Sequence, residues 1–268
     1  MPSPDLATLA STLGRALVER APCAPVTEAA PNLTVEDAYT IQRWNVEERL
    51  RRGLHGRPAR LVGHKIGITS KAVQDWLKVR EPDFGCLLDD MVVEDGGEAP
   101  MRFLLQPRVE GEIAFVLGSA LQGPGVTAAD VLRATDFVLP CVEVVDSRVR
   151  DWKIQYVDTI ADNASSGLFL LGTRPVSLRG IDLPLVGMAL RKNGQVVSTG
   201  AGAACLGNPV SAVAWLANKL AELSPDGPGL QAGHVVLSGA LGPVAPIEAG
   251  DVIEVELAHL GRASMRFV

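Results

Sequence analysis

The sequence predicts an α+β protein, with a smaller, mainly helical amino-terminal portion over residues 1–60 and a β-rich domain over 61–268. Two patterns support this division. Leucines recur at intervals of three or four residues near the amino terminus, which is typical of an amphipathic helix. After residue 60, many short apolar runs are separated by glycine and proline, and helical patterns are few. The second part is therefore expected to be a β-sandwich or β-roll.

The amino-terminal portion is expected to hold two helices. The leucine repeat predicts the first over roughly 5–21, and a loop with three prolines follows it. Thr34 and Asp37 have the spacing of a capping box, so a second helix should begin there, and Gly53 should end it. We expect this helical pair to act as a lid or an oligomer contact.

Short strands dominate the remainder of the chain. The Asn193-Gly194 pair between two alternating runs is a strong hairpin signal. Further helices are expected to begin after Ser70, Thr127 and Asn208. A turn is expected at 81–85, and the polar segment 147–167 is expected to be a long functional loop. Strands are expected at 61–68, 86–88, 91–93, 108–117, 138–145, 168–171, 188–191, 195–198, 235–238, 244–247, 251–257 and 263–268.

Composition excludes several classes of protein. The net charge of −6 and the absence of a basic stripe argue against a nucleic-acid-binding surface. The four cysteines have no metal or disulfide spacing, which favours a reducing cytoplasm. Neither a signal peptide nor an apolar run of 18 residues is present, so no membrane span is expected. There is no nucleophile elbow, P-loop or dinucleotide fingerprint.

Three acids are the leading candidates for a metal site. Glu110 and Glu112 share one face of the predicted strand 108–117, roughly 7 Å apart, and Glu143 interrupts an apolar strand downstream. If the two strands are neighbours, three carboxylates converge, which suits a hard divalent cation. The alternative is that Glu110 and Glu112 lie on an ordinary solvated face, but Glu143 among apolar residues argues against simple solvation.

Other polar residues could complete a site. Lys65 lies in an apolar strand, where it either extends to solvent or faces a polar cleft. Arg108 shares the face of the glutamates and either compensates charge for an anionic substrate or merely neutralises the acids. Asp83 could serve only its own turn. Backbone and hydroxyl groups near Ser165 and Ser238 could hold a substrate carboxylate.

Together, these residues resemble the 2-keto-4-pentenoate hydratases, and the pattern is shared with the 4-oxalocrotonate decarboxylases of the fumarylacetoacetase superfamily. The similarity runs from about residue 5 to the carboxyl end, and segments 150–155, 200–207 and 238–243 resemble the hydratase branch. It is carried by Lys65-Ile66-Gly67-Ile68-Thr69-Ser70-Lys71, Glu81-Pro82-Asp83-Phe84-Gly85, Pro107-Arg108-Val109-Glu110-Gly111-Glu112, Glu143-Val144-Val145-Asp146-Ser147-Arg148 and Asp158-Thr159-Ile160-Ala161-Asp162-Asn163-Ala164-Ser165.

The resemblance implies a mixed β-roll core of the fumarylacetoacetase carboxy-terminal type, with Mg²⁺ or Mn²⁺ held by Glu110, Glu112 and Glu143. It implies that Lys65 and Asp83 are the acid–base residues, that the chain is a homo-oligomer, and that it associates with a pathway 4-oxalocrotonate decarboxylase. The implied reaction is the hydration of 2-hydroxypenta-2,4-dienoate to 4-hydroxy-2-oxopentanoate in meta-cleavage degradation of aromatic compounds.

Three alternatives remain. The first is decarboxylation through the same metal-enolate chemistry. The second is a non-catalytic subunit that stabilises a partner enzyme, although such a subunit has no need of the acids. The third is a C–C hydrolase of the superfamily, which usually needs a His–Glu pair that the sequence lacks.

Overall fold

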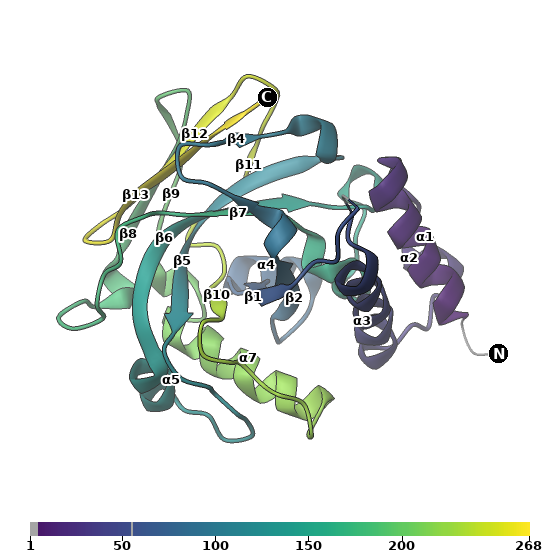
Figure 1. Cartoon of the computed structure of the whole chain (residues 1–268), viewed down its shortest axis with the longest axis horizontal. Coiled ribbons are helices and arrows are strands. Elements are labelled where there is room, and N and C mark those ends of the chain that lie inside the picture. Colours follow the sequence, from purple (N-terminus) through teal and green to yellow (C-terminus); the bar gives the residue numbers. More distant parts are fainter. Residues whose placement is uncertain (1–4, 55) are drawn as a thin grey trace.

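The computed structural model describes residues 5–54 and 56–268 and has the predicted α+β architecture (Figure 1). The amino-terminal portion comprises α1 (Leu6–Glu19), α2 (Val26–Ala29) and α3 (Val35–Arg52). The side chain of Asp5 caps α1, and Thr34 with Asp37 forms the expected capping box of α3. The two predicted helices are confirmed, whereas α2 lies inside the segment that the prolines had indicated as loop.

Two sheets form the β-rich part. The first is a mixed eight-stranded sheet with the strand order β2-β1-β10-β5-β6-β7-β3, and β11 pairs with β5 beside this path. Its strands are β1 (Leu61–Gly67), β2 (Asp83–Leu88), β3 (Val92–Val93), β5 (Pro107–Leu117), β6 (Thr135–Asp146), β7 (Ser166–Leu171), β10 (Val235–Leu237) and β11 (Ala245–Pro246). Strands β5 and β6 are long and strongly curved (Figure 1).

The second sheet has five strands in the order β4-β13-β12-β8-β9. These are β4 (Glu98–Ala99), β8 (Gly187–Lys192), β9 (Gln195–Ala201), β12 (Val252–Leu257) and β13 (Gly261–Phe267). Its side chains pack closely on β5, where a Cβ at Gly111 would lie 2.7 Å from Cγ2 of Val255 and 3.2 Å from Cγ of Met188. The glycine between Glu110 and Glu112 therefore lets the second sheet approach one face of β5.

The remaining helices are short, apart from α7. They are α4 (Lys71–Leu77), α5 (Ala128–Ala134), α6 (Tyr156–Ala161) and α7 (Pro209–Leu223), with 3₁₀ turns at Asp89–Met91, Met101–Phe103, Arg150–Trp152, Asn163–Ser165, Leu183–Leu185 and Gly202–Ala204. Figure 1 shows α1–α3 on one side of the sheets and α5 with α7 at one end. No helix in the described ranges is long and apolar enough to cross a membrane.

Two expectations about local structure were wrong. The segment 147–167 is not an irregular loop, because it contains α6 and two 3₁₀ turns. The predicted turn at 81–85 ends earlier than expected, because Asp83 already pairs with Gly67 and opens β2. In both places long-range contacts order a chain whose local sequence favours turns.

Buried side chains from the helical portion and from both sheets form one hydrophobic cluster, to which Leu13, Ile41, Val109 and Phe267 all belong. The division at residue 60 falls between α3 and β1 and remains a proposal about domain organisation.

Candidate metal centre and proton-transfer site

The pairing of β5 with β6 brings the three glutamates together. Glu110 lies directly opposite Glu143 in the antiparallel register, and Glu112 is two residues further along the same face of β5. One carboxylate oxygen from each lies within 4.8 Å of the others. The exposed fractions of Glu110, Glu112 and Glu143 are 8%, 0% and 1%. A solvated face is therefore excluded, and the predicted convergence is confirmed.

The carboxylates are poorly satisfied by the protein itself. Oε2 of Glu112 accepts a hydrogen bond of 2.7 Å from the backbone N–H of Gly239, whereas Oε1 has no partner. Neither oxygen of Glu143 has a hydrogen-bond partner, although Oε1 lies 3.1 Å from Nζ of Lys65. A buried carboxylate without partners is costly. These oxygens therefore have the properties of ligands for a group that the protein chain does not supply.

Burial and mutual repulsion favour the protonated forms of these acids in the metal-free protein. Burial, and then the charge of Glu143, raise the pKa of Glu110 to about 8. Burial, followed by the charges of Glu143 and Glu110, raises the pKa of Glu112 well above its usual value. A divalent cation would remove this repulsion, and an all-oxygen donor set suits Mg²⁺ or Mn²⁺. The residues present therefore fit such an ion, and the described ranges contain no second cluster of this kind.

Lys65 is buried beside the glutamates, with 2% of its surface exposed, so its side chain does not extend to solvent. Burial alone disfavours its charge. The acids around it, with Glu143 first and Asp83 next, outweigh that effect and raise the pKa of Lys65 above its ordinary value. Its ammonium group therefore remains protonated at neutral pH.

Asp83 is also buried, with 1% exposed, and is not an ordinary turn residue. Its Oδ2 accepts a short hydrogen bond from the hydroxyl of Thr159, whereas Oδ1 has no partner. Burial raises the pKa of Asp83, and the nearby charge of Lys65 partly offsets this. A Cβ at Gly67 would lie 2.2 Å from Oδ1 of Asp83 and 3.7 Å from Nζ of Lys65. The bare backbone of Gly67 thus borders the space between these two groups.

Arg108 does not neutralise the glutamates. Its guanidinium carbon lies 4.6 Å from the ring centroid of Trp152, and no ion pair joins it to an acid in the part of the chain that the structure describes. The indole N–H of Trp152 donates to the carbonyl of Gln106, which holds the ring in place. The guanidinium charge is therefore available to an anionic ligand, as the first of the two sequence interpretations requires.

The two predicted serines differ. The Ser165 hydroxyl is buried without a partner, in a turn where Asn163, Ala164 and Ser165 all have left-handed φ angles of 49–54°. Such strain persists only where the surroundings enforce it. The Ser238 hydroxyl, by contrast, donates to the carbonyl of Gly239 at 3.3 Å. The backbone next to Ser238 holds a carboxylate of the protein, that of Glu112.

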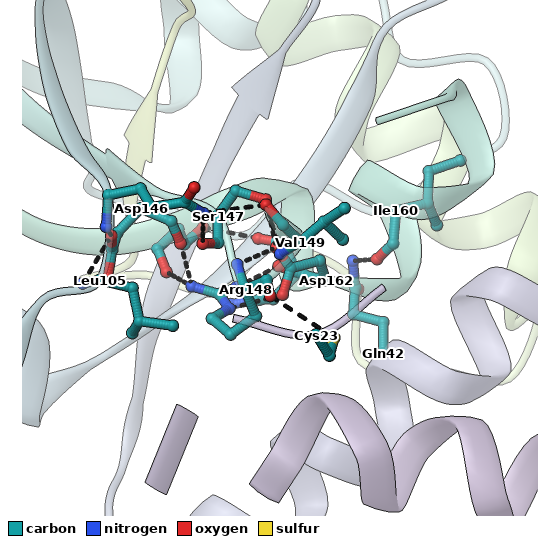
Figure 2. A network of polar contacts seen from close by, with 12 residues as sticks. Cys23, Gln42, Leu105, Asp146, Ser147, Arg148, Val149, Ile160 and Asp162 are labelled. Carbon is teal, nitrogen blue, oxygen red and sulfur yellow. Dashed lines mark hydrogen bonds and ion pairs between the residues drawn. The ribbon is translucent and has the colours of Figure 1, made fainter. Parts of the chain in front are cut away.

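A buried ion pair fixes the segment that carries Ser165 (Figure 2). Nε of Arg148 binds the carboxylate of Asp162, and its Nη1 donates to the carbonyls of Asp146 and Ser166. The second carboxylate oxygen of Asp162 accepts from the Ser147 hydroxyl and from the backbone N–H of Arg148. No short-range pattern links residue 148 to residue 162, so this network has no signal in the sequence.

Sequence reasoning also missed the polar residues that surround Asp83. Thr159, Gln42 and Asn163 bind its side chain or the backbone that follows it. Thr159 and Asn163 fall in the polar segment 147–167 and in the stretch 158–165 that carries the family resemblance, but neither signal gave them a role. Gln42 lies on an ordinary amphipathic helix, where nothing distinguishes it.

The fold and the buried acid cluster define a class of enzyme that comparisons with known proteins identify. Residues 59–268 match the fumarylacetoacetate hydrolase C-terminal family. The chain is 48% identical to the 2-keto-4-pentenoate hydratase of Paraburkholderia xenovorans strain LB400, with 96% of this chain and 93% of the relative covered. It is 55% identical to a 2-hydroxypent-2,4-dienoate hydratase of Pseudomonas putida, with coverage of 79% and 94%.

Among solved structures, the 4-oxalocrotonate decarboxylase of Pseudomonas putida G7, complexed with magnesium and adipate, superposes with a TM-score of 0.92. The two sequences are 38% identical, and the match covers 100% of this chain and 99% of the other. The chain therefore belongs to the fumarylacetoacetate hydrolase C-terminal family, in the branch that includes the 2-keto-4-pentenoate hydratases.

Proposed function

We propose that this chain hydrates 2-hydroxypenta-2,4-dienoate to 4-hydroxy-2-oxopentanoate in the meta-cleavage degradation of aromatic compounds. It is a hydro-lyase, as its hydratase relatives are. The observation that carries the proposal is the buried cluster of three glutamates with unsatisfied oxygens beside Lys65 and Asp83. Such a cluster is costly to a folded protein unless a ligand uses it.

Glu110, Glu112 and Glu143 would hold the divalent cation, Mg²⁺ or Mn²⁺. When bound, the ion supplies Lewis-acid stabilisation of negative charge on the substrate's 2-oxygen and carboxylate. The Gly239 N–H fixes one oxygen of Glu112 and leaves the other free to bind. Lys65 beside Glu143 limits the excess negative charge of the three carboxylates.

Lys65 and Asp83 would carry the proton transfers. The dienol loses its 2-hydroxyl proton and gains one at C5, giving the 2-oxo-3-enoate. Water then adds at C4, and C3 gains a proton. Nζ of Lys65 carries a proton to donate, and Oδ1 of Asp83 is an oxygen free to accept one. Each group is expected to contribute about 10²–10⁴-fold in rate.

Arg108 and Ser165 are the proposed substrate-binding groups, with Ser238 in a lesser role. The guanidinium of Arg108 has no acid partner in the described chain, and the Ser165 hydroxyl is buried with none at all. Both therefore have donors available for a substrate carboxylate. The Ser238 hydroxyl is already engaged with the Gly239 carbonyl, so its contribution is limited to the turn that holds Glu112.

Decarboxylation of a 2-oxohex-3-enedioate is the second candidate, favoured by the superposition on the 4-oxalocrotonate decarboxylase. The two activities are separated by offering each substrate to the purified protein with Mn²⁺ and recording ultraviolet absorbance and CO₂. We expect loss of the dienoate without CO₂ release. Rapid CO₂ release from the enedioate, with the dienoate untouched, would contradict the hydratase proposal. A non-catalytic subunit would leave both substrates unchanged.

The metal assignment has its own test. Glu110→Gln should weaken Mn²⁺ binding at least tenfold in isothermal titration, because one anionic ligand becomes a neutral amide. The matched control is Glu47→Gln, which changes an exposed glutamate of α3 and should leave the affinity unchanged. Equal affinities for wild type and Glu110→Gln would show that the assignment is wrong.

We also propose that the enzyme is a cytoplasmic homo-oligomer that associates with a pathway decarboxylase. The family resemblance motivates this proposal. Light scattering of the purified chain, alone and mixed with the decarboxylase, tests both assemblies, and a monomer that does not bind the decarboxylase would contradict them.

A further inference from the structure

The edge of β2 that carries Asp83 is bound by side chains rather than by another strand. β2 is the terminal strand of the eight-stranded sheet, with β1 on one side only. Along the other side, the Tyr156 hydroxyl donates to the carbonyl of Pro82 at 2.7 Å, and the Asn163 amide exchanges two hydrogen bonds with the backbone of Cys86, at 2.7 and 3.0 Å. The segment 156–166 thus forms a cradle along residues 82–86.

Gly85 allows this cradle to lie close to the strand. A Cβ at Gly85 would lie 2.4 Å from the carbonyl oxygen of Asn163 and 2.6 Å from Oγ of Ser166. Side-chain pairing of this kind also protects a strand edge from unwanted association. The position of Asp83 is consequently set by residues about 75 positions further along the chain.

Gln42, in α3, links the cradle to β2. Its Nε2 donates to the carbonyl of Phe84 at 2.8 Å and to that of Ile160 at 2.9 Å; Figure 2 shows the bond to Ile160. These carbonyls belong to the residues directly after Asp83 and Thr159. One amide group, 3% exposed, therefore keeps the strand of Asp83 and the helix of Thr159 in register.

Thr159 makes the single side-chain hydrogen bond to Asp83 that the described residues provide. Its hydroxyl has one proton and two acceptors within reach, Oδ2 of Asp83 at short distance and the carbonyl of Tyr156 at 3.3 Å. A hydrogen bond to an ionised carboxylate is shorter and stronger than one to a neutral carbonyl. When Asp83 is ionised, the Thr159 proton therefore lies on the Asp83 side.

We propose that Thr159 is a positioning residue that occupies Oδ2 of Asp83, so that Oδ1, the oxygen facing Gly67 and Lys65, alone gives and takes protons in the reaction. This inference rests on the proposed function, because it assumes that Asp83 transfers protons. The two oxygens of the Asp83 carboxylate then have different roles, because Oδ2 holds the Thr159 hydroxyl and Oδ1 is free to exchange protons. Without the hydroxyl, the proton could reside on either oxygen, and only Oδ1 lies beside Gly67 and Lys65.

The direction of the expected pH effect follows from the hydrogen bond. Burial raises the pKa of Asp83 most, and the charge of Glu143 adds to this effect, whereas the charge of Lys65 and then donation from Thr159 lower that pKa by stabilising the ionised carboxylate. Removing the hydroxyl should raise that pKa further. The limb of the pH–rate profile that depends on Asp83 therefore moves to higher pH, whether Asp83 acts as acid or as base.

The test compares three variants of the Mn²⁺-loaded enzyme. Thr159→Val removes the hydroxyl at nearly constant volume and is expected to lower kcat about 10- to 100-fold with little change in KM. Thr159→Ser keeps the hydroxyl and should restore kcat to within about threefold of wild type. Thr27→Val is the matched control. The Thr27 hydroxyl, in α2, binds another buried carboxylate, that of Asp158, which precedes Thr159 in α6. This control should leave kcat and the pH profile unchanged.

Two outcomes would overturn the inference: a Thr159→Val enzyme with wild-type kcat and pH profile, or a loss of kcat that Thr27→Val reproduces with no shift of the limb. If Thr159→Val does not fold, Thr159→Ala replaces it with the same expectations.

A measurement without substrate separates this inference from the proposed function. Carbon-13 labelling of the aspartate carboxyls, with Asp83→Asn to identify the signal, gives the titration of Asp83 directly. The titration should move to higher pH in Thr159→Val even if the wild type hydrates no dienoate. An unmoved titration would contradict the role of Thr159, and a shifted titration without hydratase activity would contradict only the proposed reaction.

Discussion

The protein contains two clusters of buried charge on adjacent strands and turns, and they differ in one respect. In the Arg148–Asp162 cluster, both carboxylate oxygens of Asp162 have donors, and the guanidinium donates to Asp162 and to two further carbonyls (Figure 2). In the glutamate cluster, Lys65 is the nearby cation, and three oxygens of Glu112 and Glu143 have no hydrogen-bond partner. Burial is nearly the same in both places.

This difference separates a structural cluster from a functional one. Desolvation raises the pKa of Asp162, but Arg148 opposes it directly. No group in the described chain opposes the repulsion within the glutamate cluster to the same extent, since Lys65 serves all three acids. Satisfied buried charges hold a segment in place, whereas unsatisfied carboxylate oxygens are able to bind a ligand.

The largest expected effect is on the satisfied cluster. Arg148→Met should lower the free energy of unfolding by about 3–5 kcal/mol, because it leaves Asp162 buried and uncompensated. Urea unfolding of the metal-free protein measures this. Arg133→Met is the control, because its ion pair with Asp130 lies on the surface and should contribute little. If Arg148→Met lowers the free energy of unfolding no more than Arg133→Met does, the distinction between the two clusters is wrong.

The next effect concerns the space between Lys65 and Asp83. Gly67→Ala places a methyl carbon 2.2 Å from Oδ1 of Asp83, so one of them must move. A displacement of about 1 Å in a reacting group can cost about 100-fold in rate, and kcat should fall by that order. Gly187→Ala, in β8, should be neutral, because nothing lies within 4 Å of the added Cβ. Unchanged kcat in Gly67→Ala would show that this space is not used in catalysis.

The smallest effect is a pH dependence of stability. The pKa of Glu110 is about 8 in the folded protein, against an ordinary value near 4.5. A carboxyl whose pKa is raised on folding favours the folded state fully below pH 4.5 and loses that contribution as the pH rises through 8. Glu110→Gln should therefore gain stability relative to the metal-free wild type, by an amount that grows as the pH rises from 5 to 8.5.

Thermal unfolding at each pH measures this difference, and saturating Mn²⁺ should reverse it, because the wild type then binds the ion more tightly. Glu47→Gln serves as the control for removing an exposed acid. A difference that is flat with pH would show that Glu110 is not strained by its neighbours in the metal-free protein.

Much of the fold could be predicted because it depends on local pattern. The capping box at Thr34 and Asp37, the Asn193-Gly194 hairpin and the alternating strands all have signals within a few residues. Helix α6 was not predicted, and strand β2 begins earlier than predicted. The contacts that order them come from distant residues, because Gln42 binds the carbonyls of Phe84 and Ile160.

The sequence by itself determined which residues could form a site: Glu110 and Glu112 on one strand face, Glu143 in an apolar strand, and Lys65 where a lysine is poorly solvated. Their chemical types and their spacing along each strand are local properties. Only the tertiary structure decided that the Arg108 guanidinium packs on the Trp152 ring. It also decided that the Gly239 N–H binds Glu112 and that Thr159 binds one oxygen of Asp83. These contacts depend on the register of strands and helices far apart in the chain, and pairing between distant segments is encoded by the whole core rather than by any short motif.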